Sequence, residues 1–241
     1  MAGERDPWAA HRRRAGALRA RYGFAAEVLR LYIAVAEVWA YTWERGETDA
    51  GKVLPRIVDA TVASGPRFLA EAVREPGDMD EAISVWLAGG DLPPVQRYLV
   101  RTCLKPLPIP AAEPADERHC QHCGGPPQLS VRPPGGDPLV SERRRLVCAR
   151  CSQTWDYSRT ACPSCGESQG AQRTLYAEES GDRFPHLRID ACRSCRHYLI
   201  DVDLGRDRDA VPDVDELAAV PLDLYAADHG LTKITPNIMG F

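Results

Sequence analysis

The sequence lacks an uninterrupted apolar segment long enough to cross a membrane. Three charged side chains interrupt its longest apolar stretch, residues 24–43, whereas a spanning helix needs about 20 predominantly apolar residues. The basic start at residues 12–14 is not followed by the apolar core of an export signal, because Arg19 and Arg21 lie where that core would be. The sequence therefore predicts a cytoplasmic protein with no membrane partner.

A strong excess of one charge is also missing. The 30 Lys and Arg residues nearly balance the 34 Asp and Glu residues, which leaves a net charge of −4 and no general attraction for nucleic acid. A phosphate-binding loop, a G-x-G-x-x-G motif and a nucleophile elbow are lacking, and the histidines suggest no catalytic triad. We therefore expect that the protein is not an enzyme and that it has no small-molecule substrate. The 241 residues, 44% of them hydrophobic, are enough for a core and two domains.

The first hundred residues have the periodicity of amphipathic helices, so residues 1–106 are predicted to form a helical domain. One helix is expected from residue 24, with its apolar stripe at Phe24, Val28, Leu31, Val35, Val38 and Thr42. A second is expected after Pro66, burying Phe68 and Leu69. Further helices are predicted after Asp78 and after Pro94.

Beyond residue 106 the pattern changes. Residues 107–117 are rich in proline and predict a stiff linker. Short β-like segments follow at residues 129–132, 145–147, 154–157, 174–177, 187–190 and 198–204. They predict a first rubredoxin-like or zinc-ribbon module at residues 118–158 and a second at 159–205. Residues 206–241 are expected to form a C-terminal helical segment and an extended tail. Pro221 should mark either a break or a fresh first turn in that segment, and one apolar face is expected at Leu217, Val220, Leu224 and Ala227. The predicted fold class is α+β.

Eight of the nine cysteines lie in four C-x-x-C pairs. They are Cys120, Cys123, Cys148, Cys151, Cys162, Cys165, Cys192 and Cys195. Each pair places two thiolates on one tight turn, and two such turns make the four-sulfur shell that Zn²⁺ and mononuclear iron prefer. Cys165 is followed by Gly166, as in the knuckles of rubredoxins and zinc ribbons, and Cys123-Gly124 repeats this feature. We predict that all eight cysteines are metal ligands, while Cys103 is a small buried side chain.

The spacing favours sequential pairing of the knuckles. Only ten residues separate Cys151 from Cys162, whereas the longer gaps within each module leave room for a hairpin. A cross-brace, which joins the first pair to the third and the second to the fourth, is the alternative. Disulfides are disfavoured in a reducing cytoplasm, and four equivalent pairs exceed what a dithiol redox enzyme needs. Because the core of a ribbon this small supplies only about 3–5 kcal/mol, metal binding should decide whether the modules fold.

The sequence resembles the FdhE family of formate dehydrogenase accessory proteins. The resemblance rests on the four ordered pairs, on Trp155, on the stretch Asp190-Ala191-Cys192 through Ile200, and on Gly230-Leu231 followed by Pro236-Asn237. It covers roughly residues 92–241. The sequence departs from the family pattern in the first knuckle, where Gln121 replaces the usual proline, and in its last four residues.

The resemblance implies a non-enzymatic assembly or quality-control factor. Such proteins act in the cytoplasm on the catalytic subunit of a formate dehydrogenase, which is the partner expected for this chain. The resemblance also favours iron, so that two mononuclear tetrathiolate ions would be held by the eight cysteines, whereas spacing alone allows zinc equally. Two other functions stay open. One is a rubredoxin-like electron carrier, and the other is a zinc-ribbon nucleic-acid binder that uses arginines near the knuckles.

Overall fold

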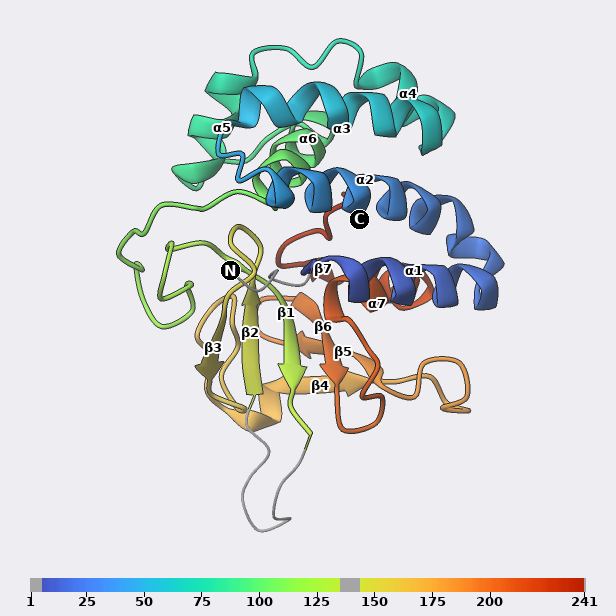
Figure 1. Cartoon of the computed structure of the whole chain (residues 1–241). Helices are drawn as coiled ribbons and strands as arrows, with labels where there is room; N and C mark the ends of the chain where they lie inside the picture. Colours follow the sequence, from blue (N-terminus) through green and yellow to red (C-terminus); the bar gives the residue numbers. More distant parts are fainter. Residues whose placement is uncertain (1–5, 135–143, 241) are drawn as a thin grey trace. The chain divides into compact units, whose positions relative to one another are not determined.

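The structure is a computed structural model that describes residues 6–134 and 144–240. It divides into two compact units. The first contains the residues up to Ile109 together with Ile238–Gly240, and the second contains Pro110–Asn237. The first unit is helical and the second is built on a β-sheet (Figure 1), which confirms the predicted α+β class.

The first unit is formed by α1 (Ala9–Arg21), α2 (Ala26–Glu44), α3 (Ala50–Ser64), α4 (Arg67–Ala72), α5 (Met79–Leu87) and α6 (Pro94–Leu104). Asp49 and Asp78 cap α3 and α5, because their side chains accept hydrogen bonds from backbone N–H groups of the first turn. The indole of Trp39 on α2 is fully buried and donates a 2.8 Å hydrogen bond to the carbonyl of Thr102 on α6. This bond joins the longest helix to the last helix of the unit.

Two details of the predicted helical core are wrong. Phe24 is 52% exposed and Phe68 is 74% exposed, although both were expected to be buried. On α2, Leu29, Tyr32 and Trp39 are fully buried. The helix packs against both α1 and α3, so its apolar surface is wider than a single stripe and is centred elsewhere on the helix. No helix of the described residues combines the length and the apolar character needed to cross a membrane.

The second unit contains two three-stranded antiparallel ribbons. The first consists of β1 (Pro127–Arg132), β2 (Arg144–Cys148) and β3 (Thr154–Tyr157), and the second of β4 (Arg173–Tyr176), β5 (Leu187–Cys192) and β6 (His197–Asp203). Each predicted β-segment overlaps one of these strands. The ribbons join through parallel pairing of β1 with β6, which gives one sheet of order β3-β2-β1-β6-β5-β4. The short strand β7 (Thr232–Lys233) pairs with β6 off this path.

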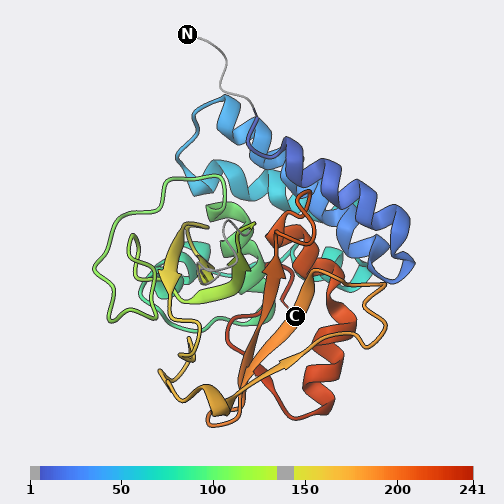
Figure 2. The same cartoon turned by 90° about the horizontal axis from the view of Figure 1, so that it is seen from below.

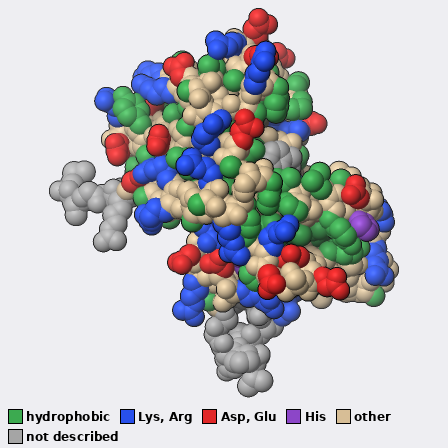
Figure 3. Space-filling view, turned by 90° about the vertical axis from the view of Figure 1, so that its right-hand side faces the viewer, with side chains coloured by type: hydrophobic (Ala, Val, Ile, Leu, Met, Phe, Trp, Pro, Cys, Tyr) green, Lys and Arg blue, Asp and Glu red, His purple; other side chains and the backbone are tan. Residues whose placement is uncertain are grey.

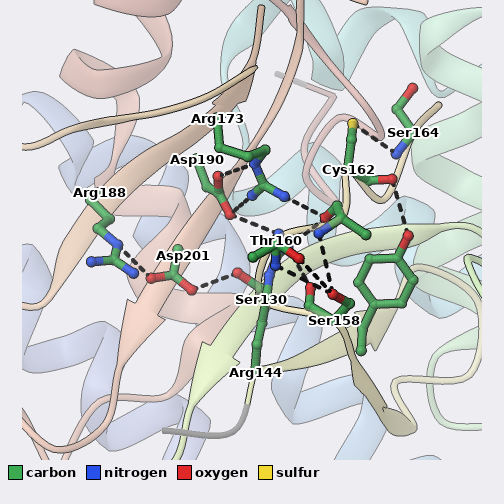
Figure 4. A network of polar contacts seen from close by, with 12 residues as sticks. Ser130, Arg144, Ser158, Thr160, Cys162, Ser164, Arg173, Arg188, Asp190 and Asp201 are labelled. Carbon is green, nitrogen blue, oxygen red and sulfur yellow. Dashed lines mark hydrogen bonds and ion pairs between the residues drawn. The ribbon is translucent and has the colours of Figure 1, made fainter. Parts of the chain in front are cut away.

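A buried carboxylate stabilises the junction between the ribbons. The carboxylate of Asp201 on β6 accepts a 2.6 Å hydrogen bond from the hydroxyl of Ser130 on β1. It also contacts the guanidinium groups of Arg132 and Arg188, each at 2.8 Å. Figure 4 shows Asp201 between Ser130 and Arg188. The carboxylate thus accepts hydrogen bonds from the hydroxyl and from both guanidinium groups. These contacts help to hold β1 and β6 in one register.

Two helices follow the sheet, in agreement with the expectation that Pro221 could begin a fresh first turn. They are α7 (Pro212–Ala218), which contacts β6, and α8 (Val220–Asp228), which contacts β5 (Figure 2). Pro221 lies in the first turn of α8, where its missing N–H costs no helical hydrogen bond. Leu217 is buried as expected, but Leu224 is 62% exposed. The predicted common apolar face is therefore wrong, because the break at Ala219 reorients the second helix.

Candidate metal centres

The four C-x-x-C pairs adopt the same local turn. In each, the residue after the second cysteine donates its backbone N–H to the carbonyl of the first cysteine. Gly124 and Gly166 make this bond at 2.9 Å, Ser152 at 3.1 Å and Arg196 at 3.0 Å. All four residues have φ in the left-handed region, at +65°, +78°, +61° and +62° respectively. The turn directs both sulfurs of a pair to the same side.

Sequence reasoning recognised this turn only where glycine marks it. Ser152 and Arg196 are the only non-glycine residues of the described chain with positive φ, a conformation in which a Cβ crowds the following carbonyl oxygen. The side chain of Arg196 donates to the carbonyl of His229, and this bond helps hold the strained residue. The turn that closes the C-x-x-C pair therefore outweighs the side-chain preference at two of the four knuckles.

Replacing Ser152 by glycine should relieve part of this strain. We expect Ser152→Gly to raise the free energy of unfolding by about 1 kcal/mol, because glycine adopts positive φ without steric cost. Urea denaturation of metal-loaded protein would measure the change. The matched substitution Ser158→Gly, outside the knuckles, should not stabilise the protein. A Ser152→Gly variant that unfolds at lower urea concentration than the parent would contradict the strain argument.

The sulfurs gather into two clusters. Sγ of Cys120 lies 3.5 Å from Sγ of Cys151, and Sγ of Cys123 lies 3.5 Å from Sγ of Cys148. In the second cluster, the distances from Cys162 to Cys195 and from Cys165 to Cys192 are both 3.8 Å. Within each cluster all four sulfurs lie within 4.8 Å of one another. The grouping is therefore sequential, and the cross-brace alternative is excluded.

These distances fit a tetrahedral metal site. With a metal–sulfur bond of about 2.3 Å, the sulfurs of a regular tetrahedron are separated by roughly 3.8 Å. A disulfide would instead need a separation of about 2.05 Å, and all nine cysteines are free thiols in the structure. Both clusters could therefore hold a metal ion. The geometry does not distinguish iron from zinc, because both accept four thiolates.

The thiols of the first cluster shift one another's pKa values in opposite directions. The hydrogen bond from the Cys148 thiol lowers the pKa of the Cys120 thiol to about 6. The same neighbour is the main cause that lowers the pKa of Cys123. The backbone N–H of Arg150 donates to Sγ of Cys148 at 3.3 Å, and such a bond stabilises a thiolate. The same contacts with Cys120 and Cys123 raise the pKa of Cys148, so the four thiols share protons among themselves and release them when a metal ion binds.

Two buried arginines support the second cluster. The carboxylate of Asp190 lies 2.8 Å from the guanidinium of Arg144 and also binds that of Arg173. Both arginines donate to the carbonyl of Ala161, next to Cys162, as Figure 4 shows in part. These arginines stabilise the approach to the third knuckle. They are committed to internal contacts and do not form a basic surface for nucleic acid.

Sequence reasoning missed a third group of polar residues. Nε2 of His186 lies 2.8 Å from a carboxylate oxygen of Asp215, and Nδ1 lies 3.9 Å from Asp207. His186 and Asp215 are both buried. The sequence suggested no partner for His186, because this pair joins residues 29 positions apart on either side of β5 and β6. Their contact connects the loop before β5 to α7.

A pocket of about 510 Å³ lies beside β4 and α8. Its lining includes the apolar side chains of Phe184, Ile189 and Leu222 and the charged residues Glu178, Glu179 and Arg183. Leu175 and Tyr225 also line this pocket and are 51% and 41% exposed. Figure 3 shows hydrophobic side chains gathered near a histidine on the face that it presents. The lining therefore combines apolar and charged groups.

Comparison with known proteins agrees with this architecture. Residues 160–239 match the family model described as "FdhE, C-terminal domain". A protein FdhE homolog of Aquifex aeolicus is 30% identical over 166 residues, which are 66% of this chain and 57% of that protein. A homolog from Pseudomonas aeruginosa is 33% identical over 121 residues, 50% of this chain and 38% of that protein. The chain thus matches only about half the length of these relatives or less.

A solved structure shares the fold over nearly the whole chain. The crystal structure of the FdhE protein from Pseudomonas aeruginosa superimposes with a TM-score of 0.69 at 19% identity, covering 99% of this chain and 97% of that one. At this identity the likeness concerns the fold alone. Taken with the family model and the sequence relatives, it shows that the chain resembles FdhE proteins in fold and that residues 160–239 match the C-terminal domain of that family.

Proposed function

We propose that this protein is a non-catalytic metal-binding accessory factor that binds the catalytic subunit of a formate dehydrogenase during its assembly or quality control. The observation that carries the proposal is the pair of four-cysteine clusters, each with tetrahedral dimensions, on a fold shared with the FdhE family. The resemblance to the family suggests the formate dehydrogenase subunit as the partner. The clusters suggest that the protein binds metal ions through thiolates.

In this proposal, the eight cysteines hold two mononuclear ions. Four thiolates complete a tetrahedral shell, which leaves no position for a substrate or an activated water. Such an ion stabilises a surface or transfers single electrons, but it does not turn over a small molecule. The family resemblance favours iron, and zinc is the alternative. A cytoplasmic site of action agrees with nine free thiols, because a reducing compartment keeps them from forming disulfides.

The proposal predicts that the catalytic subunit co-purifies with the intact protein and not with a variant that lacks the second centre. We expect Cys162→Ser together with Cys165→Ser to reduce capture of the subunit and formate dehydrogenase activity in the cell by roughly tenfold or more, because the knuckle loses its metal. Affinity capture of the tagged protein, followed by quantification of the subunit and of enzyme activity, would measure both effects.

A matched control is Cys103→Ala. Cys103 lies on α6 in the helical unit, and burial raises the pKa of its thiol to about 12, so it stays protonated and should not bind metal. This variant should capture the subunit normally. Normal enzyme assembly in the double variant would contradict the proposal. A colourless, zinc-loaded protein that supports assembly would exclude the electron-carrier alternative, since zinc has no redox chemistry.

A further inference from the structure

We propose that the two metal centres are not equivalent: the first holds its ion durably, whereas the second is an exchangeable centre whose ion enters and leaves at the exposed ligand Cys165. This inference rests on the metal binding in the proposed function and extends it. It concerns a soft divalent ion and an external thiolate or chelator that can bind that ion.

The two centres differ most at one equivalent position. Cys123 and Cys165 are each the second cysteine of a knuckle, and each is followed by a glycine with positive φ. Cys123 is only 3% exposed, whereas Cys165 is solvent-exposed. At the other equivalent positions the two centres have the same degree of burial. Cys120 and Cys162 are both buried, and so are Cys148 on β2 and Cys192 on β5. The contrast therefore reflects what covers the knuckle and not the knuckle itself.

The chain that leads into the first ribbon covers its first knuckle. The backbone N–H of Ala112 donates to the carbonyl of His122 at 2.9 Å. A Cβ placed on Gly124 would lie 3.1 Å from the carbonyl oxygen of Glu113. The indole N–H of Trp155 donates to the carbonyl of Glu117 at 3.0 Å and fixes the other end of this segment. Residues 112–117 thus form a cover over the first knuckle.

A second contact closes the first centre from another side. The guanidinium of Arg150 donates to the carbonyl of Cys123 at 3.4 Å. A Cβ on Gly125 would lie 2.8 Å from Sγ of Cys148 and 3.1 Å from the stem of Arg150. The space beside these sulfurs is therefore filled by protein atoms. An incoming ligand cannot reach the first knuckle without displacing this cover, and Cys151 is the one ligand of the first centre that is partly exposed.

The third knuckle, which carries Cys165 of the second centre, is far more open. A Cβ on Gly166 would meet only Cδ of Arg118, at 4.0 Å, among the described residues. An external ligand can therefore approach the second ion at Cys165. In the exchange, the bond between the ion and the Cys165 sulfur breaks as a bond to the incoming sulfur or nitrogen forms. No electron is transferred, and the released thiolate remains in solvent, where it is readily hydrated and reactive.

The test uses the whole chain loaded with two zinc ions, a number checked by elemental analysis. The chromophoric chelator pyridylazoresorcinol should remove them in two phases of one ion each, with rates that differ by roughly 10–100-fold. The variant Cys165→Ser should lose the fast phase. In parallel, brief treatment of the loaded wild-type protein with N-ethylmaleimide, followed by peptide mass spectrometry, should modify Cys165 before Cys123.

A second variant tests the cover without touching a ligand. Trp155→Phe keeps an aromatic ring but removes the hydrogen bond to Glu117, so it should accelerate the slow phase and leave the fast phase unchanged. Release of both ions in one phase, or equal labelling of Cys123 and Cys165, would overturn the inference while the proposed function stands. Protein that binds no ion in any preparation would refute both.

Discussion

Removing both metal ions is expected to unfold the ribbons of the second unit while the helices of the first unit persist. Structural zinc contributes about 10–16 kcal/mol of apparent binding free energy to small domains, whereas the core of a small ribbon supplies only about 3–5 kcal/mol. Hydrogen exchange followed by mass spectrometry would show this directly. After chelation, the amides of β1 to β6 should exchange freely, and those of α2 and α6 should stay protected.

The loss of amide protection in the strands should be reversible, and it should depend only on the two four-sulfur centres. Adding back iron or zinc under reducing conditions should restore protection of the strands. Cys103→Ala should bind two ions like the parent, because the thiol of Cys103 lies in the helical core. Strands that remain protected after complete removal of metal would show that the sheet is stable by itself and that metal binding does not decide whether it folds.

The second large effect is expected at a buried ion cluster formed by the C-terminal helices and β7. Nζ of Lys233 lies 2.9 Å from the carboxylate of Glu216 and 3.1 Å from that of Asp223. Glu216 is fully buried, and Lys233 has 7% of its side chain exposed. Substituting Lys233→Met would leave two buried carboxylates without their cation. We expect a loss of about 3–5 kcal/mol in the free energy of unfolding, measured by urea denaturation.

The stability lost in Lys233→Met should increase as the pH rises. Burial raises the pKa of Glu216, and the charge of Lys233 opposes that effect. Without Lys233 the folded-state pKa rises further, so the folded protein holds a proton that the unfolded chain releases. Stability of the variant relative to the parent should then fall as pH rises above the unfolded value, and the deficit should be larger at about pH 8 than at about pH 5.

An exposed ion pair provides the control for this prediction. Arg67 and Glu71 on α4 are 2.8 Å apart, but their side chains are 92% and 64% exposed. Arg67→Met should therefore cost only about 0.3–0.5 kcal/mol, because solvent screens the pair. A loss for Lys233→Met no larger than that for Arg67→Met would show that the buried cluster contributes nothing beyond a surface pair.

The knuckles and strands were readable from the sequence because their signals are local. A C-x-x-C turn requires two thiols three positions apart, and a glycine after it marks the positive φ. Short β-branched and aromatic segments bounded by turns mark strands, and Thr154–Tyr157 has the same bounds in the prediction and in the structure. Each of these features depends on neighbours within a few residues. The sequence therefore predicted both four-cysteine groups and the order of the elements.

Burial in the helical unit was harder to predict, since it depends on the number of partners a helix has. The exposure of Phe24 and Phe68 illustrates this, because a periodic stripe does not tell which of its members meets a neighbouring helix. The left-handed turns at Ser152 and Arg196 were missed for a related reason. No glycine marks them, although the turn that closes each C-x-x-C pair takes the same positive φ there.

The sequence by itself determined that eight thiols lie in four turns, on two ribbons that follow a helical region along the chain. Only the tertiary structure decided that the ribbons join through parallel pairing of β1 and β6, that His186 meets Asp215, and that residues 112–117 cover one knuckle and leave Cys165 exposed. These outcomes depend on contacts between residues far apart in the chain. Such contacts follow from how whole elements pack against one another, and short-range sequence patterns do not determine that packing.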